Sequence, residues 1–369
     1  MKNKKLKNFI MIAAGMLIGG VLGLLLMQKL NTDTGTDRSA KILRVAVLLI
    51  SLVVSYFAGI IIHEGGHLVM GLLTGYKFVS FRIGSFILVK QNGKFVIRRF
   101  SLSGTAGQCL MTHDMVEKDE DIPYFWYNAG GGLFNLLTFF ICGLVCLYSD
   151  NGYVHEGFAL AAIISAWLGV VNLIPLGALG LANDGANILD QYRSIKLRRL
   201  ILNILIINSE QSQGKLLVEL PEELFEYDGT YQSNISMNLK LMKVSRLLEE
   251  HRFEEAKTLA GEIADNSKIM AVLINEAKCE LLFCKIVTGC PPHEIDELYD
   301  DDLKKYITLS GKTMISRRRL MYAYYYIYRQ DKMNADKEYN LAVKVSENYS
   351  NTGVAKSEMS VIEYIKENY

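Results

Sequence analysis

The 369-residue sequence lacks an excess of either charge, because 40 lysines and arginines face 39 aspartates and glutamates. A balance this close to neutral gives no electrostatic reason to expect a nucleic-acid partner. Cysteine motifs are also missing, since no Cys-x-x-Cys pair occurs among the six cysteines, at positions 109, 142, 146, 279, 284 and 290. We therefore expect neither a disulfide framework nor a zinc knuckle, and a reducing environment around the C-terminal half.

Charged residues are scarce in four long apolar runs, and all four lie in the first half of the chain. They cover residues 9–27, 45–73, 126–148 and 158–181. Each is long enough to cross a bilayer as a helix. The second half is instead rich in charge, since residues 186–369 hold 25 basic and 28 acidic side chains. We predict a mostly α protein, in which a polytopic membrane helical bundle of about four transmembrane helices precedes a soluble all-helical domain.

Basic residues indicate how these helices cross the membrane. Residues 76–99 carry six Lys or Arg and no acid, and four more basic residues lie between 193 and 199. Because basic loops stay in the cytoplasm, we expect both termini there, in a multi-pass protein of a bacterial cell membrane. The four basic residues between 29 and 44 would then lie outside, which conflicts with this orientation. We keep the orientation because the other regions agree on it.

The expected division of the chain follows the same composition. Residues 185–207 mix apolar and basic side chains in a pattern typical of a helix on the inner leaflet. Residues 211–233, with Pro221 and an acidic cluster, have the composition of a linker. The four expected parts are a tail with the first transmembrane helix at 1–38, the core with a small β-hairpin insert at 39–190, an amphipathic helix and linker at 191–233, and a soluble helical domain at 234–369.

The second apolar run contains His63-Glu64-Gly65-Gly66-His67. On a helix, residues four apart share a face, so both imidazoles can bind one metal ion. Zinc lowers the pKa of a bound water to about 7, and Glu64 is placed to take that proton. The alternative is a chance motif on a structural helix, but ionisable residues within lipid are costly and functional by default. We predict a Zn²⁺ site at this motif.

A zinc site of this type needs three protein ligands and one open position. Asp184, in Asn183-Asp184-Gly185, lies near the same end of its apolar run as the histidines do on theirs. We expect its carboxylate to complete a His/His/Asp set. Asp184 has an alternative role as the cap of a helix starting near Ala186, and Asp190 is the second choice of ligand.

The order of these elements resembles the site-2 protease family of intramembrane metalloproteases. The motif at 63–67 is followed, two helices later, by Asn172-x-x-Pro175 and then by Asp184-Gly185. The resemblance extends over residues 42–190. It implies that His63, His67 and Asp184 bind zinc and that Glu64 is the catalytic base.

The same resemblance implies that the substrate contacts Asn135, Asn172 and Pro175. Asn135 ends the stretch 131–135, which is similar to the Gly-Pro-x-x-Asn element of the family. The departures from the family pattern are Gly132 where proline is usual, a longer gap between Pro175 and Asp184, and Ala186 in place of a second glycine.

We therefore expect an intramembrane zinc metalloendopeptidase that hydrolyses peptide bonds of membrane-anchored regulators or peptide precursors. The alternative is a membrane-tethered scaffold with a structural metal site and a partner-binding helical domain. Glu64 separates the two, because a structural site needs no carboxylate beside its first ligand. A transporter is disfavoured, since residues 126–148 and 158–183 contain no acidic or basic side chain.

Other signals concern the regions outside this core. Asn92-Gly93, between Phe86–Val89 and Phe95–Ile97, is a strong two-residue hairpin signal. Such a hairpin either captures an extended substrate at its edge strand or only covers the site. His113 and His155 are expected at the surface.

From Asn234 onward the pattern is helical. The spacing within residues 247–256 and 322–335 resembles helix pairs of the tetratricopeptide type, although no clean 34-residue repeat is present. The domain either offers a concave surface to a protein partner or is an all-helical domain with a Tyr-rich core.

Overall fold

The structure, a computed structural model, describes residues 38–91, 93–99, 106–175, 177–178, 181–226 and 233–369. These residues divide into two compact units. Apart from the gaps just given, unit 1 comprises residues 38–76, 106–109 and 123–195, and unit 2 comprises residues 77–99, 110–122 and 196–369.

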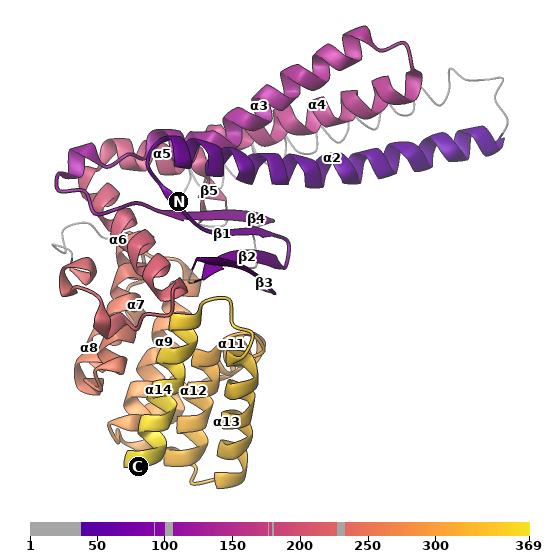
Figure 1. Ribbon diagram of the computed structural model, residues 1–369. Coiled ribbons are helices and arrows are strands. Elements are labelled where there is room, and N and C mark those ends of the chain that lie inside the picture. The colour runs from indigo at the N-terminus through magenta and orange to yellow at the C-terminus, as the bar shows by residue number, and fades with distance from the viewer. Residues whose placement is uncertain (1–37, 92, 100–105, 176, 179–180, 227–232) are drawn as a thin grey trace. The chain divides into compact units, whose positions relative to one another are not determined.

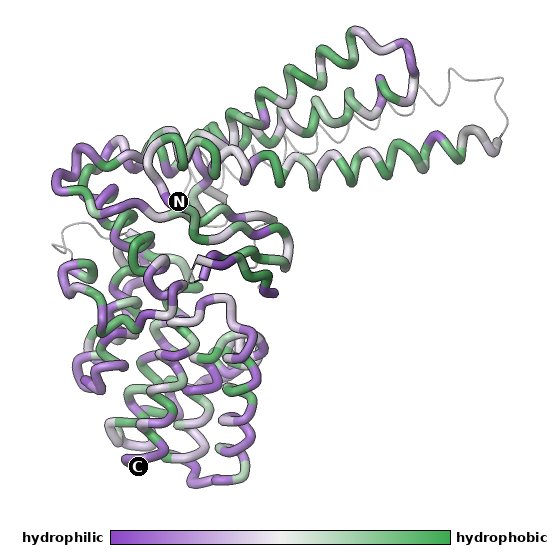
Figure 2. The backbone as a smooth tube through the Cα atoms, viewed as in Figure 1, coloured by the Kyte–Doolittle hydropathy of each residue, from purple (hydrophilic) through white to green (hydrophobic). Residues whose placement is uncertain are grey.

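Unit 1 is built on three long helices that pack against one another (Figure 1). They are α2 (Arg38–Leu73), α3 (Phe125–Tyr148) and α4 (Gly152–Leu173). Each is long and apolar enough to cross a membrane, and Figure 2 shows hydrophobic residues running along all three. Three of the four apolar runs therefore form helices compatible with a membrane protein, whereas the run at 9–27 lies outside the described residues.

Helices α2 and α3 approach closely at Gly66 and Gly130. A Cβ atom added to either glycine would strike the backbone carbonyl group of the other. Small residues allow such packing between membrane helices, where lipid provides no hydrophobic drive for association. Gly66 is thus required by the contact between helices, whereas a Cβ on Gly65 would meet open space.

The chain after α4 agrees only in part with the sequence prediction. Pro175 was expected to break the fourth apolar run, and α4 does end at Leu173, because proline lacks an N–H and disfavours helix in the residue before it. A pair of two-residue strands follows, β5 (Gly177–Ala178) and β6 (Leu181–Ala182). The single helix expected over 185–207 is two helices, α5 (Asp184–Arg193) and α6 (Ile195–Ser212), which separate at Ser194.

A sheet with strand order β3-β2-β1-β4 takes the place of the small hairpin insert. Its strands are β1 (Lys77–Ile83), β2 (Phe86–Gln91), β3 (Lys94–Arg99) and β4 (Gly107–Thr112). Strand β2 pairs antiparallel with β1 and β3. The hairpin prediction is confirmed, because Gln91 pairs with Lys94 across a two-residue turn whose Gly93 has a φ of 77°.

The expected linker at 211–233 is packed rather than extended over its described residues. Two 3₁₀ turns, η2 (Leu217–Glu219) and η3 (Glu222–Phe225), bury apolar side chains against α6. Arg246 holds this segment by donating to the carbonyl oxygens of Leu217 and Leu220 at 3.1 and 2.7 Å. The apolar residues of α6 from Leu197 onward are therefore covered by protein, which corrects the expectation of an inner-leaflet contact for that part. For residues 188–195, where Tyr192 and Ile195 are exposed, it stays a prediction.

The C-terminal part of unit 2 is helical, as expected. Its elements are α7 (Asn234–Glu249), α8 (Phe253–Ala264), α9 (Ala271–Val287), α10 (Pro292–Leu298), α11 (Asp301–Ser310), α12 (Ile315–Ala323), a π-helical turn η4 (Tyr324–Tyr328), α13 (Lys332–Ser346) and α14 (Thr352–Asn368). They enclose one large apolar cluster.

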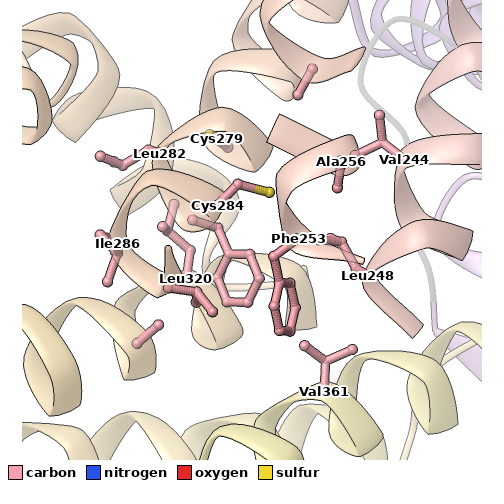
Figure 3. Close-up of a cluster of buried hydrophobic side chains, with 14 of the residues drawn as sticks. Val244, Leu248, Phe253, Ala256, Cys279, Leu282, Cys284, Ile286, Leu320 and Val361 are labelled. Carbon is pink, nitrogen blue, oxygen red and sulfur yellow. The ribbon is translucent and has the colours of Figure 1, made fainter. Parts of the chain in front are cut away.

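Figure 3 shows part of this cluster, where Val244 of α7, Phe253 of α8, Cys284 of α9, Leu320 of α12 and Val361 of α14 meet. Tyr322 is fully buried in it, while the tyrosines of η4 pack against it and remain partly exposed. Tyrosine therefore contributes to this core, and the resemblance to tetratricopeptide helix pairs stays a prediction.

Candidate metal site

The two histidines of the motif converge because they stand one helical turn apart on α2. The Nε2 atoms of His63 and His67 lie 3.2 Å apart. Both side chains are largely shielded, with 12% and 10% of their surface exposed. Their Nε2 atoms therefore lie next to each other near the C-terminal end of the helix.

Asp184, the first residue of α5, reaches the same volume. Its Oδ2 atom lies 3.1 Å from His63 Nε2 and 3.4 Å from His67 Nε2. Among the residues that the structure describes, these three side chains form the group whose potential ligand atoms come together. Asp190, the second choice of ligand, is exposed on the same helix and does not belong to this group.

Asn183, not Asp184, caps helix α5. Its side-chain oxygen accepts a hydrogen bond from the Ala186 N–H at 3.0 Å. Its Nδ2 donates to the carbonyl oxygens of Val171 and Ile174, both at 2.7 Å, and so ties the start of α5 to the end of α4. The cap proposed as the alternative role of Asp184 is thus supplied by its neighbour, which leaves the Asp184 carboxylate facing the histidines.

The three donor atoms fit a zinc ion. A tetrahedral zinc with bonds of about 2.0–2.1 Å separates its ligand atoms by roughly 3.3 Å, and the observed separations are 3.1, 3.2 and 3.4 Å. Asp184 Oδ2 is buried, and its close neighbours among the described groups are the two imidazole nitrogens, so no other hydrogen-bond donor competes for this oxygen. Burial opposes ionisation of Asp184, but the adjacent imidazoles outweigh it and lower its carboxyl pKa to about 2. The set offers two imidazole nitrogens and one anionic oxygen.

Gly131 of α3 keeps this volume open. A Cβ atom at that position would lie 2.5 Å from His67 Nε2 and 2.7 Å from His63 Nε2. Any side chain there would clash with both imidazole rings at their donor atoms. The glycine is therefore needed at this position for the donor atoms to remain accessible.

Helix α3 also holds both imidazole rings from their far sides. His67 Nδ1 lies 2.7 Å from the carbonyl oxygen of Tyr127, which fixes Nδ1 as the protonated nitrogen and leaves Nε2 as a donor to metal. Asn135 Nδ2 lies 3.2 Å from His63 Nδ1, and Asn135 Oδ1 is buried without a partner. Turning this amide over would pair Oδ1 with a protonated Nδ1, the tautomer that metal binding at Nε2 requires.

Glu64 is buried beside the histidines and is held by the start of strand β4. The backbone of Cys109 hydrogen-bonds its carboxylate, and a Cβ on Gly107 would lie 2.6 Å from its Oε1. The carbonyl oxygen of Cys109 in turn accepts a hydrogen bond from the Tyr127 hydroxyl at 2.9 Å. Backbone groups of the strand therefore fix the position of the carboxylate. Tyr127 contacts both this strand, through its hydroxyl, and His67, through its carbonyl oxygen.

The thiol of Cys109 is not a candidate ligand. Burial, and secondly the nearby Glu64 carboxylate, raise its pKa to about 12. A thiol that is protonated at neutral pH is a poor metal ligand, because the thiolate is the form that binds.

The three residues that the family resemblance implies contact a substrate, Asn135, Asn172 and Pro175, lie in three different surroundings. Asn135 contacts a histidine, as described above. Asn172 donates from its side chain to the carbonyl oxygen of Leu168 on its own helix at 2.9 Å, and Pro175 is exposed beyond the helix end. His155 is exposed and His113 partly exposed, and neither joins the ligand group among the described residues.

Sequence reasoning missed four residues of the site: Gly131, Tyr127, Cys109 and Asn183. Asn183 could have been found, because asparagine before a helix is a favoured cap. The triple glycine at 130–132 is an unusual feature that could have drawn attention to position 131. Tyr127 and Cys109 act largely through backbone atoms, which leave no signal in residue type.

No protein-family model matches the chain, and neither curated proteins nor solved structures give a significant match.

Proposed function

We propose that this chain is a zinc metalloendopeptidase that hydrolyses peptide bonds within or at the edge of a membrane, in the manner of the site-2 protease family. The observation that supports it best is the convergence of two imidazoles and a carboxylate beside Glu64, on a helix apolar enough to cross a bilayer. Ionisable groups in such a helix are expensive, and they are retained where they serve a function.

His63, His67 and Asp184 would hold the ion. A bound zinc ion would act as a Lewis acid on a water molecule and on the scissile carbonyl group. Glu64 would accept the proton of that water as it adds to the carbonyl carbon, and would return the proton to the leaving amine nitrogen. Cys109 keeps Glu64 in place for both transfers, and the shielded position of the histidines limits the access of bulk water.

The proposed substrate is a membrane-anchored regulator or a peptide precursor, since the site lies on a helix with the length and hydropathy of a membrane span. In this proposal the protein crosses a bacterial cell membrane several times with both termini in the cytoplasm. The helical part of unit 2 would bind a protein partner or the soluble part of the substrate.

The roles proposed for the asparagines differ. Asn135 is assigned to the orientation of His63 because it contacts that ring. Asn172 and Pro175 remain the proposed substrate-side residues. The exposed position of Pro175 at the end of α4 is consistent with that role.

The ligand set is tested by the zinc content of the purified full chain. About one zinc per chain is expected, and it should be lost when His63, His67 or Asp184 is changed to alanine, because two remaining ligands make a weak site. Asp190→Ala is the matched control on the same helix and should retain zinc. Zinc loss in Asp190→Ala but not in Asp184→Ala would overturn the assignment.

The activity is tested with the same preparation on a library of single-span membrane peptides. Chelation should stop cleavage and added zinc should restore it. Cleavage that survives complete removal of metal would contradict the proposal, and a zinc-loaded protein that cleaves no peptide would favour the scaffold alternative.

A further inference from the structure

One face of the sheet in unit 2 is apolar and, among the described residues, partly to strongly exposed. Side chains alternate across a strand, and residues paired across antiparallel strands share a face. The pairing therefore places on one face, here called the outer face, the side chains Phe81, Ile83, Phe86, Leu88, Phe95 and Ile97. Three of them are strongly exposed, namely Phe86 at 57%, Phe95 at 62% and Ile97 at 70%.

The opposite face of the sheet is packed. Ile87, Val89 and Arg82 are buried there, and Arg98 donates to the carbonyl oxygen of Glu347 in the helical part of the same unit at 3.2 Å. A soluble sheet with one packed face ordinarily presents polar side chains on the other. The outer face breaks this rule, and contiguous exposed apolar surface of this kind marks an interaction site.

The charge around the outer face is basic. Residues 77–99 contain six Lys or Arg and no acid, but Arg82, Lys94 and Arg98 lie on the opposite face. Lys90 and Arg99 lie on the outer face itself, paired across the strands with Phe95 and Phe86, and both are exposed. The Arg99 guanidinium lies over the Phe86 ring, 5.4 Å from its centre, so a positive charge is in cation–π contact with one of the exposed aromatic side chains.

We propose that the outer face docks on the anionic phospholipid surface of the membrane, with Phe86, Phe95 and Ile97 inserted at the boundary between headgroups and acyl chains. Apolar side chains beside basic ones, here Lys90 and Arg99, match such a surface, because the first enter the interface and the second bind lipid phosphates. A protein partner would be expected to supply acidic complements and hydrogen bonds to the strand edge, whereas the apolar and basic groups here lie on the face of the sheet. The inference rests on the proposed membrane location and is independent of peptide hydrolysis.

The test uses tryptophan fluorescence of the full chain in anionic vesicles that contain brominated lipid. The native Trp126 and Trp167 lie on α3 and α4, and their quenching reports that these helices are in lipid. With both changed to phenylalanine, Phe95→Trp places a single probe on the outer face. Lys94→Trp is the matched control, because Lys94 is exposed, adjacent in sequence and on the opposite face.

Quenching at position 95 should exceed quenching at position 94 by roughly twofold or more, since bromine quenches only at short range within the bilayer. Adding Lys90→Glu and Arg99→Glu should bring the position-95 probe toward the control value. Equal quenching at 94 and 95 while the native tryptophans are quenched would overturn the docking proposal and leave the membrane location intact. A position-95 probe shielded from both lipid and aqueous iodide would indicate a second protein copy on this face, and would also overturn it. Unquenched native tryptophans would instead show that α3 and α4 are not in lipid, and would contradict the membrane location on which this proposal rests.

Discussion

At the scale of single residues, the candidate site depends on the glycine at position 131 as much as on the three side chains that offer donor atoms. His63, Glu64 and His67 could be found in the sequence, because their spacing is set by one helical turn. Asp184 required a long-range inference, which the structure supports by bringing its carboxylate to both imidazoles. Gly131 could not be assigned this role from the sequence, since its importance lies in volume that only the packing of α3 against α2 defines.

Gly131→Ala should remove zinc without unfolding the protein. Its new Cβ would clash with both Nε2 atoms, so zinc content should fall at least about tenfold, as expected when donors cannot close on the ion. Alanine favours helix over glycine by about 1 kcal/mol, so a loss of fold is not expected. The measurements are zinc content and helicity by circular dichroism.

The matched control is Gly143→Ala on the same helix, where an added Cβ would meet open space. It gains the same helix propensity and should keep its zinc. Equal zinc in the two variants would show that position 131 does not border the metal.

At the scale of elements, local signals predicted turns and helix ends better than packed irregular segments. Asn92-Gly93 predicted the hairpin, and proline explains where α4 ends. The segment 217–225, with its apolar residues, lies within the stretch 211–233 that was predicted to be a linker because of Pro221 and an acidic cluster. Those residues are nevertheless buried against α6 and α7, and such packing is visible only in three dimensions.

The helical part of unit 2 should therefore need this segment. Leu239 of α7 is fully buried in the cluster formed with α6 and the 3₁₀ turns, and neither apolar cluster of the unit contains a residue before Leu197. A fragment of residues 196–369 should be helical and water-soluble. A fragment of residues 234–369 should be less stable by about 2 kcal/mol or more, because uncovering one buried leucine costs about 1.5–3 kcal/mol.

Urea unfolding of both fragments, followed by circular dichroism, measures the difference. Identical midpoints and slopes would mean that residues 196–233 contribute nothing to the fold. Insolubility of the longer fragment without detergent would contradict the division of the chain into membrane and soluble halves.

At the scale of the whole molecule, composition predicted the mostly helical fold, while orientation in the membrane stays a prediction. The basic residues at 29–44 conflicted with the proposed orientation. One of them is now accounted for, because Arg44 forms a salt bridge with the buried Glu156 of α4. An arginine held by a carboxylate is a weaker topological signal than the basic run at 76–99.

A reporter active only in the cytoplasm should therefore work when fused at Tyr369 or inserted between residues 113 and 118, and should fail near Asn151. The reason is that basic segments stay on the cytoplasmic side. A reporter active only outside the membrane gives the complementary control. Cytoplasmic activity at Asn151 would reverse the orientation and place the metal site at the outer side.

The central claim, hydrolysis driven by Glu64 beside a bound zinc, is tested most directly by Glu64→Gln. Glutamine keeps the size and a hydrogen-bonding group but cannot accept the proton, and the three ligands are untouched. Zinc content and expression should stay near wild type, while cleavage should fall by about 10²–10⁴-fold, the usual contribution of general acid–base catalysis. The variant should also retain uncut substrate.

The measurement is the amount of new peptide termini in membranes that contain wild-type or Glu64→Gln protein, with zinc determined on the same samples. We predict many new peptide termini with the wild-type protein and few with Glu64→Gln, while both proteins keep their zinc. Equal cleavage by the two proteins, each with its zinc, would contradict the proposed peptidase mechanism.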